Sequence, residues 1–234
     1  MKTSLKKTLA VLAAAALAPQ FSNAQLLVTE INSNASGGDF WELTNFGLSP
    51  VNLFNGATPW SWDDDSDTPG ASLLPLGISI ASGESIIILP DTTDVAGFRN
   101  VWGLDLSVQV LSVSVQIGLG QNDRVTLFDD ANNPVVSLNY AAGGFTRSSG
   151  DASTGGHAGV SAGGLNTQSA IWDPNFGNTP GTARYTVATN AVFGSFAAPN
   201  GNGYGSPGLV PEPTTTALAG LGLAAVLIFR RRNH

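Results

Sequence analysis

The chain has 234 residues, of which 42% are hydrophobic, and its formal net charge is −7 at pH 7. It has no cysteine, which excludes disulfide bonds and catalysis by a thiol. All three lysines precede residue 8, and residues 25–210 hold sixteen acidic side chains against four arginines. Because such an acidic surface repels phosphate groups, we expect no nucleic-acid partner.

The first 24 residues have the pattern of a secretory signal peptide. The three lysines precede an uninterrupted small and apolar run over residues 9–18, which is too short to span a bilayer. Small residues then occupy positions 22 and 24, as a signal peptidase requires. We therefore expect a signal helix that signal peptidase removes between Ala24 and Gln25, so that the remaining chain is exported. The alternative is an amphipathic N-terminal helix, but no polar face interrupts the run.

Strand patterns dominate the residues that follow the signal peptide. Residues rich in β-branched and aromatic side chains, several of them alternating with polar ones, fill five segments: 26–31, 40–43, 78–81, 85–89 and 108–115. A single helical pattern lies between Asp94 and Trp102, with Thr93 or Asp94 as its N-cap and Gly103 as its end. We therefore expect an all-β fold with one short helix.

A hairpin is predicted next in the chain. Residues 123–128 and 135–140 form two β runs, and the Asp- and Asn-rich segment 129–134 between them suits a turn and not a strand. Short strands separated by turns at such intervals are typical of a β-sandwich or a barrel.

These segments, in their order, resemble the opening of a lamin-tail domain. The residues that carry the resemblance are Glu30-Ile31, Trp41-Glu42-Leu43 with Asn45, Val51-Asn52-Leu53 and Trp60-Ser61-Trp62. The resemblance covers residues 25–142 and implies an immunoglobulin-like β-sandwich that serves in interactions. It also implies that Glu30 and Glu42 are structural and accept hydrogen bonds from backbone donors or an arginine. Ser206-Pro207-Gly208 looks like the closing turn of that family.

A change of composition marks residues 143–208. Gly, Ser, Asn and Thr dominate this segment, which is typical of loops and linkers. It nevertheless contains Ile171, Trp172, Tyr185 and Phe196, which are too apolar for a fully solvated stalk. We interpret it as a long insertion that packs partly on the sandwich and supplies one hairpin. A flexible spacer is the alternative.

An acidic run at residues 63–67 is the most distinctive local motif. Asp63, Asp65 and Asp67 place carboxylates at every second position, and such oxygen ligands suit Ca²⁺. The run lacks the glycine and the distal glutamate of an EF-hand loop. The alternative is a solvated turn whose charges keep a strand edge from pairing with another chain. Calcium is the one cofactor that the sequence suggests.

Candidates for catalysis are few. His157 is the only histidine between the two end segments, and it lacks a nucleophile motif or a second histidine for zinc. Glu30 and Glu42 could form the carboxylate pair of a glycosidase, but the lamin-tail resemblance favours a structural role for both. Trp172, beside Asp173-Pro174-Asn175, is the tryptophan that we expect to contact a ligand such as a sugar. We expect no enzymatic activity.

The last 25 residues form a sorting segment. Two prolines interrupt regular structure, and residues 214–229 then carry no charge. As a helix these sixteen residues would span about 24 Å, less than the roughly 30 Å of a hydrocarbon core. The following arginines would stop this apolar helix on the cytoplasmic side of the membrane. The motif residues are Val210, Pro211, Glu212 and Pro213, and the stop residues are Arg230, Arg231 and Arg232.

This arrangement resembles the PEP-CTERM sorting signal over residues 210–234. The resemblance implies a Gram-negative envelope, transient membrane insertion, and an exosortase-type enzyme that removes the tail. It also implies release or attachment of the mature protein in an exopolysaccharide matrix, as in a biofilm. An ordinary single-pass transmembrane anchor is the alternative.

Together these features predict an exported, non-enzymatic protein of the cell surface or extracellular matrix. Its β-sandwich would act as an interaction or adhesion module for exopolysaccharide or other surface proteins. The alternatives are a carbohydrate-binding module or carbohydrate-active enzyme of the matrix, and a weak calcium-dependent adhesion module.

Overall fold

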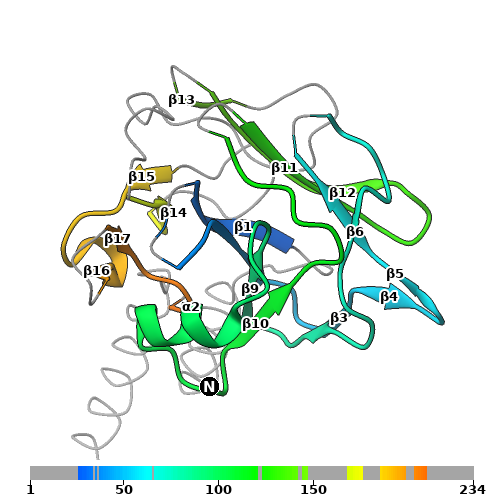
Figure 1. Ribbon diagram of the computed structural model, residues 1–234, viewed down its shortest axis with the longest axis horizontal. Helices are drawn as coiled ribbons and strands as arrows, with labels where there is room; N and C mark the ends of the chain where they lie inside the picture. Colours follow the sequence, from blue (N-terminus) through cyan, green and yellow to red (C-terminus); the bar gives the residue numbers. More distant parts are fainter. Residues whose placement is uncertain are drawn as a thin grey trace, which may run out of the picture. The chain divides into compact units, whose positions relative to one another are not determined.

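Strands form most of the regular structure in the computed structural model (Figure 1). The structure describes residues 26–33, 35, 37–64, 66–120, 123–141, 144–146, 168–175, 185–198 and 203–209. These residues belong to one folded unit that extends from Asn23 to Pro211. The predicted all-β class is confirmed. The signal peptide, its cleavage residues Ala24 and Gln25, and the sorting segment 210–234 lie outside the described residues.

The first sheet has six strands and is built around the β1–β2 hairpin. Its strands are all antiparallel to their neighbours apart from the parallel pair β9 and β10. In spatial order they are β10 (Gln109–Ser112), β9 (Ser85–Leu89), β2 (Phe40–Asn45), β1 (Leu26–Asn32), β14 (Ala170–Trp172) and β15 (Tyr185–Val187).

The second sheet has five antiparallel strands and contains the predicted hairpin. The hairpin strands are β11 and β12, which pair from Asp123 with Tyr140 to Phe128 with Pro134. In spatial order the sheet consists of β13 (Gly144–Thr146), β12 (Pro134–Ala141), β11 (Asp123–Phe128), β6 (Ser61–Asp63) and β7 (Ser72–Leu73).

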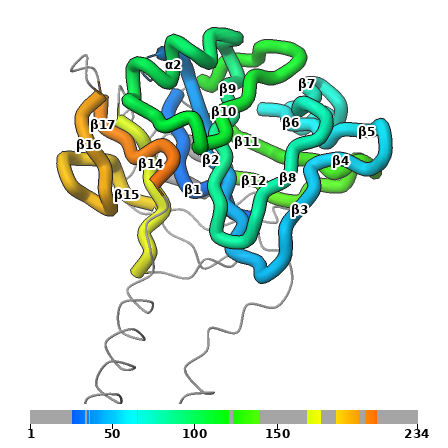
Figure 2. Tube along the Cα trace, turned by 90° about the horizontal axis from the view of Figure 1, so that it is seen from below, coloured from blue at the N-terminus to red at the C-terminus, as the bar shows by residue number. Residues whose placement is uncertain are grey.

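Three small two-stranded ladders and an isolated bridge between Gln168 and Tyr204 complete the β structure of the described residues. They lie in the connections and do not join either larger sheet. The ladders are β3 (Val51–Asn52) with β8 (Ser79–Ile80), β4 (Phe54–Asn55) with β5 (Thr58–Pro59), and β16 (Phe196–Ala197) with β17 (Tyr204–Gly205). Figure 1 and Figure 2 both place the β16–β17 ladder beside β14 and β15, and the β4–β5 ladder at the opposite end of the domain.

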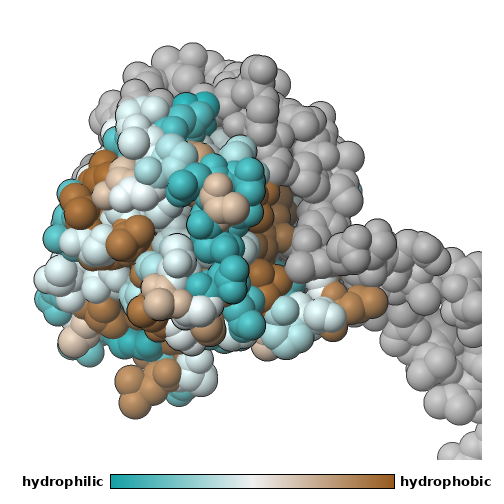
Figure 3. Space-filling model, turned by 90° about the vertical axis from the view of Figure 1, so that its right-hand side faces the viewer, coloured by the Kyte–Doolittle hydropathy of each residue, from teal (hydrophilic) through white to brown (hydrophobic). Residues whose placement is uncertain are grey.

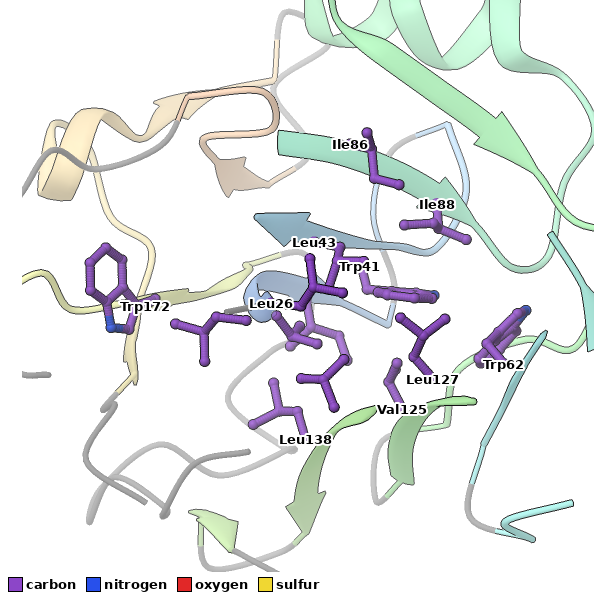
Figure 4. Close-up of a cluster of buried hydrophobic side chains, with 14 of the residues drawn as sticks. Leu26, Trp41, Leu43, Trp62, Ile86, Ile88, Val125, Leu127, Leu138 and Trp172 are labelled. Atoms are coloured by element: carbon purple, nitrogen blue, oxygen red, sulfur yellow. The ribbon is translucent and has the colours of Figure 1, made fainter. Parts of the chain in front are cut away.

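The main hydrophobic core lies between the two larger sheets (Figure 4). Trp41 and Leu43 of β2 face Trp62, Val125 and other side chains of the second sheet, because alternate residues of a strand point to the same face. Trp41 and Trp62 are fully buried, with ring centroids 6.0 Å apart.

A second core lies on the other face of the first sheet, where helix α2 (Val95–Trp102) packs. Ile87 and Leu89 of β9 point to this face, whereas Ile86 and Ile88 point to the main core. The first sheet is therefore covered on both sides. This explains why residues 86–89 form an uninterrupted apolar run, as in other strands that are buried on both faces.

Helix α2 connects the two parallel strands of the first sheet. Parallel neighbours need such a crossover, because a tight turn can join only antiparallel strands. The predicted helix and its caps are confirmed: the Asp94 side chain accepts from the Gly97 N–H, and Gly103 has φ 65°. The strand predicted at 108–115 ends at Ser112, because the chain then crosses to the second sheet, where the Ser114 N–H donates to the Leu73 carbonyl.

The Gly-rich segment contributes to the first sheet. Strand β14 pairs with β1, and β15 pairs with β14. The Tyr185 hydroxyl of β15 donates to the Val28 carbonyl, and Tyr185 is fully buried. These strands extend the sheet on the β1 side.

In the part of the chain that the structure describes, no helix is long and apolar enough to cross a membrane.

Candidate functional site: the closing turn and its glutamate pair

Two glutamates lie opposite one another in the β1–β2 hairpin. Glu30 of β1 is the register partner of Glu42 of β2, and each is 1% exposed. The register shifts between Val28 and Glu30, which makes Thr29 the extra residue of a β-bulge. The Thr29 hydroxyl donates to Glu42 Oε1 at 2.5 Å. The bulge therefore brings a hydroxyl to one carboxylate of the pair.

Residues 206–209 form a tight turn, here called the closing turn. The Leu209 N–H donates to the Ser206 carbonyl at 2.8 Å, and Gly208 has φ 79°. Proline as the second residue and a glycine with positive φ as the third are the signature of a type II turn. The residue types at positions 206–208 are therefore those that this turn requires.

The closing turn donates its hydrogen bonds to the two glutamates. The Ser206 N–H lies 3.0 Å from each carboxylate oxygen of Glu30, and the Ser206 hydroxyl donates to Oε2 at 2.9 Å. The Gly208 N–H donates to Glu42 Oε2 at 2.6 Å. These contacts join residues that are 176 and 166 positions apart in the chain. The pair therefore fastens the last described turn to the first hairpin.

Two glycines allow the turn to approach so closely. A Cβ atom on Gly205 would lie 2.5 Å from Glu30 Oε1 and 2.8 Å from Ser169 Oγ. A Cβ atom on Gly208 would lie 3.0 Å from Val108 Cγ1, and the positive φ of Gly208 also disfavours any other residue. Any larger residue at Gly205 would force the turn away from the carboxylates.

Burial changes the protonation of the pair. It raises the pKa of Glu30 to about 8. The charge of Glu42 also raises this pKa, whereas the hydrogen bonds from Ser169 and Ser206 lower it. Burial also raises the pKa of Glu42, although Thr29, Gly208 and Ser85 donate hydrogen bonds to it. Because like charges on paired residues repel one another in a desolvated site, the two carboxyl groups hold a proton more readily than ordinary glutamates.

The arrangement agrees with the structural interpretation of Glu30 and Glu42. Their hydrogen-bond partners are backbone amides and hydroxyls, and at 1% exposure neither carboxylate meets solvent. The sequence contained both halves of this contact, the two glutamates and the Ser-Pro-Gly turn. No local pattern indicated that they meet, because the contact is made only when the fold closes.

The acidic run is organised around Asp63. Asp63 is 2% exposed, and its Oδ2 accepts from the Ser66 hydroxyl and the Thr68 N–H, each at 2.5 Å. Asp67 forms an ion pair with Arg124 at 2.7 Å and accepts from the Thr126 hydroxyl at 2.6 Å. Asp65 lies outside the described residues. Of the residues that the structure describes, no three acidic or histidine side chains converge as metal ligands, and calcium binding stays a prediction.

Trp172 is placed differently from our expectation. It lies in strand β14 and not in the loop that follows, and its side chain is 1% exposed. Its ring packs against Phe46, with centroids 4.9 Å apart. Strand β14 pairs with β1 at residues 170 and 171, and the Trp172 ring lies buried in the main core and not at the surface where we expected a ligand contact.

A comparison with protein-family models matches residues 209–232 to the PEP-CTERM protein-sorting motif. The protein carries an exosortase sorting signal. This motif indicates export, processing by an exosortase-type enzyme, and a place on the cell envelope of a Gram-negative bacterium. No curated protein and no solved structure matches the chain.

The sorting motif and the closing turn share a residue. Leu209 is the last residue of the turn and the first residue matched to the motif. The folded unit is therefore held by its glutamate pair up to the point where the sorting signal begins.

Proposed function

We propose that this protein is a non-enzymatic module of the cell surface or extracellular matrix, which its sorting signal delivers through the envelope. The β domain would be the part that remains after exosortase processing and that mediates adhesion or association with the matrix. The tail would hold the precursor in the membrane until the enzyme removes it.

The contact between the closing turn and the glutamate pair supports this proposal most directly. Glu30 and Glu42, the two acids that best suited a hydrolytic site, are buried and accept hydrogen bonds from Ser206 and Gly208. Their role is to complete the domain directly before the sorting motif. A folded unit that ends where the signal begins suits a protein whose domain is cargo and whose tail is removed.

We further propose that the domain is a lamin-tail-like, immunoglobulin-related sandwich. Two packed sheets with one core between them, and a closing turn that caps the structural glutamates, fit the expectation from that resemblance. The β9–α2–β10 crossover between parallel strands is the feature that such an assignment must accommodate.

Mass spectrometry of the mature protein from an exosortase-containing Gram-negative host tests the sorting role. We expect a chain without residues 214–229 in that host, and an intact tail in a matched strain without the enzyme. A mature protein that retains residues 214–229 in both strains would contradict it.

A binding measurement tests the role of the domain. We expect the mature protein to sediment with the host's exopolysaccharide matrix and to leave the polysaccharide unchanged in length. Release of shortened sugars that a Glu42→Gln variant abolishes would instead identify a carbohydrate-active enzyme. Sedimentation that requires calcium and is lost with Asp67→Asn would identify a calcium-dependent adhesion module.

A further inference from the structure

Exposed apolar side chains lie around the point where the chain leaves the domain. Leu209, the last described residue, is 50% exposed, and Leu106 is 86% exposed. Val192 and Phe193 of the short helix η2 (Val192–Gly194) are half-buried. We call these four residues the exit face.

Two close approaches place the segments that carry these side chains beside the closing turn. A Cβ atom on Gly208 would lie 3.0 Å from Val108, which is two residues from Leu106. A Cβ atom on Gly194 would lie 3.9 Å from Leu209 Cδ1, and Gly194 directly follows Phe193. The loop at 104–108 and helix η2 therefore both border the turn from which the sorting motif continues.

The loop that carries Leu106 is held in place from α2. Arg99 of α2 donates to the carbonyl of Asp105 at 2.7 Å and to the carbonyl of Val108 at 2.5 Å. The two acceptors lie on either side of Leu106. Since both ends of this short loop are tied down, the exposed leucine is presented by a fixed loop.

Chain length limits what the exit face can meet. Thr214, where the apolar segment begins, lies five residues after Leu209, so the connection spans at most about 18 Å when fully extended. A tail inserted in the bilayer therefore keeps Leu209 within about 18 Å of the hydrocarbon boundary. The headgroup region is roughly 5 to 8 Å deep on each side of the hydrocarbon core. A connection shorter than its fully extended length therefore brings Leu209 to this region, where leucine and phenylalanine side chains bind favourably.

We infer that the exit face rests on the lipid surface while the sorting tail is still attached. This inference depends on the membrane insertion of the tail under the proposed function. Contact with lipid would orient the domain and keep the junction at Leu209 next to the membrane, where a membrane enzyme acts. On the face shown in Figure 3, apolar residues form separate patches among hydrophilic ones.

Single-cysteine labelling of the full chain tests the inference, because the protein has no cysteine of its own. Leu106→Cys and Phe193→Cys place an environment-sensitive fluorophore on the exit face. Leu48→Cys and Leu76→Cys are the matched controls, since these leucines are 69% and 56% exposed. They precede β3 and β8, which lie toward the other end of the domain from β16 and β17 (Figure 1 and Figure 2).

The labelled precursors are reconstituted into phosphatidylethanolamine–phosphatidylglycerol vesicles that contain a headgroup-quenching lipid. We expect at least threefold stronger quenching at positions 106 and 193 than at positions 48 and 76. Equal quenching at all four positions in vesicles that carry the protein would overturn the inference and leave sorting untouched. Quenching that rises with protein density at constant quencher would show a second copy as the occupant. Failure of the full chain to float with vesicles would contradict the inserted tail and, with it, the inference.

Discussion

At the scale of single residues, the unusual feature is a pair of buried carboxylates that has hydrogen-bond donors and no ion pair among the described residues. Burying a charge costs several kcal/mol unless hydrogen bonds compensate it, and Glu30 and Glu42 are compensated by Ser206, Gly208 and Thr29. A carboxyl group in such a site favours its neutral form, and the raised pKa values express this. The closing turn is therefore bound by groups that respond to pH.

The stability of the domain should fall as pH rises. The pKa of Glu30 is raised from 4.5 to about 8 in the folded protein, so the folded state binds more protons between these values. Its contribution is full below about pH 4.5 and is lost as pH passes about 8. Asp39, whose pKa burial and the charge of Asp91 raise to about 6, acts in the same direction over a lower range.

Glu30→Gln should flatten this dependence between pH 6 and pH 8, where we expect the parent's unfolding free energy to change by up to about 1.4 kcal/mol per pH unit. Urea unfolding at several pH values measures it. Asp130→Asn, which removes one charge from a turn at the surface, is the control and should keep the parent's slope. A slope that is equal in the parent and in Glu30→Gln would contradict the assignment of the proton to Glu30.

Gly205→Ala tests the close approach of the turn. A methyl group there meets Glu30 Oε1 at 2.5 Å and Ser169 Oγ at 2.8 Å, so we expect a loss of about 2 kcal/mol of unfolding free energy. Gly118→Ala is the control, because the atoms nearest to its new methyl group lie at 3.7 and 3.8 Å. Equal melting temperatures for the two variants would argue against tight packing at Gly205.

At the scale of elements, helix α2 decides the shape of the first sheet. It covers one face of that sheet through Phe98 and Trp102, and it joins the parallel strands β9 and β10. Phe40, Phe98 and Trp102 contact one another with ring centroids 5.3 to 6.3 Å apart. The helix is short, so its N-cap and this aromatic cluster supply much of what keeps it formed.

Asp94→Ala should destabilise the domain by about 1 kcal/mol, because the Gly97 N–H loses its side-chain acceptor. The neighbouring Thr93→Ala is the control, since the bond that Thr93 makes here uses its carbonyl, which accepts from the Val95 N–H. Thermal unfolding of both variants measures the difference. A Thr93→Ala variant as unstable as Asp94→Ala would indicate that Asp94 is not the cap that matters.

At the scale of the whole molecule, the domain is closed by contacts between its first and last described segments. Glu30 and Glu42 lie in the first hairpin, and the closing turn lies at 206–209. Strands β14 and β15, from the Gly-rich segment, lie between them in the chain and add to the same sheet. Folding therefore cannot be completed until the chain up to residue 208 is present.

A truncation tests this closure. A chain that stops after residue 202 leaves both glutamates buried without their donors from the turn, and we expect it to lose about 3 to 5 kcal/mol, a large part of a typical domain's stability. A chain that stops after residue 209 keeps every contact of the turn and should match the parent. Equal urea midpoints for the two chains would show that the closing turn is dispensable.

The sequence by itself determined the features that depend on local chemistry. Asp94 and Gly103 bounded the helix, the Asp- and Asn-rich turn defined the β11–β12 hairpin, and alternating or β-branched runs identified several strands, because caps, turns and pleats act between near neighbours. The Pro-Glu-Pro motif at 211–213 could be recognised for the same reason, and the family comparison supports the sorting signal at residues 209–232.

Only the tertiary structure decided where these pieces meet. The burial of Trp172, the early end of β10 at Ser112 and the parallel pairing of β9 with β10 all follow from contacts across the sheets. The bonds from Ser206 and Gly208 to Glu30 and Glu42 span more than 160 residues of chain. Periodicity carries no information over such separations, because the energy that selects these partners appears only when the core is closed and the carboxylates leave water.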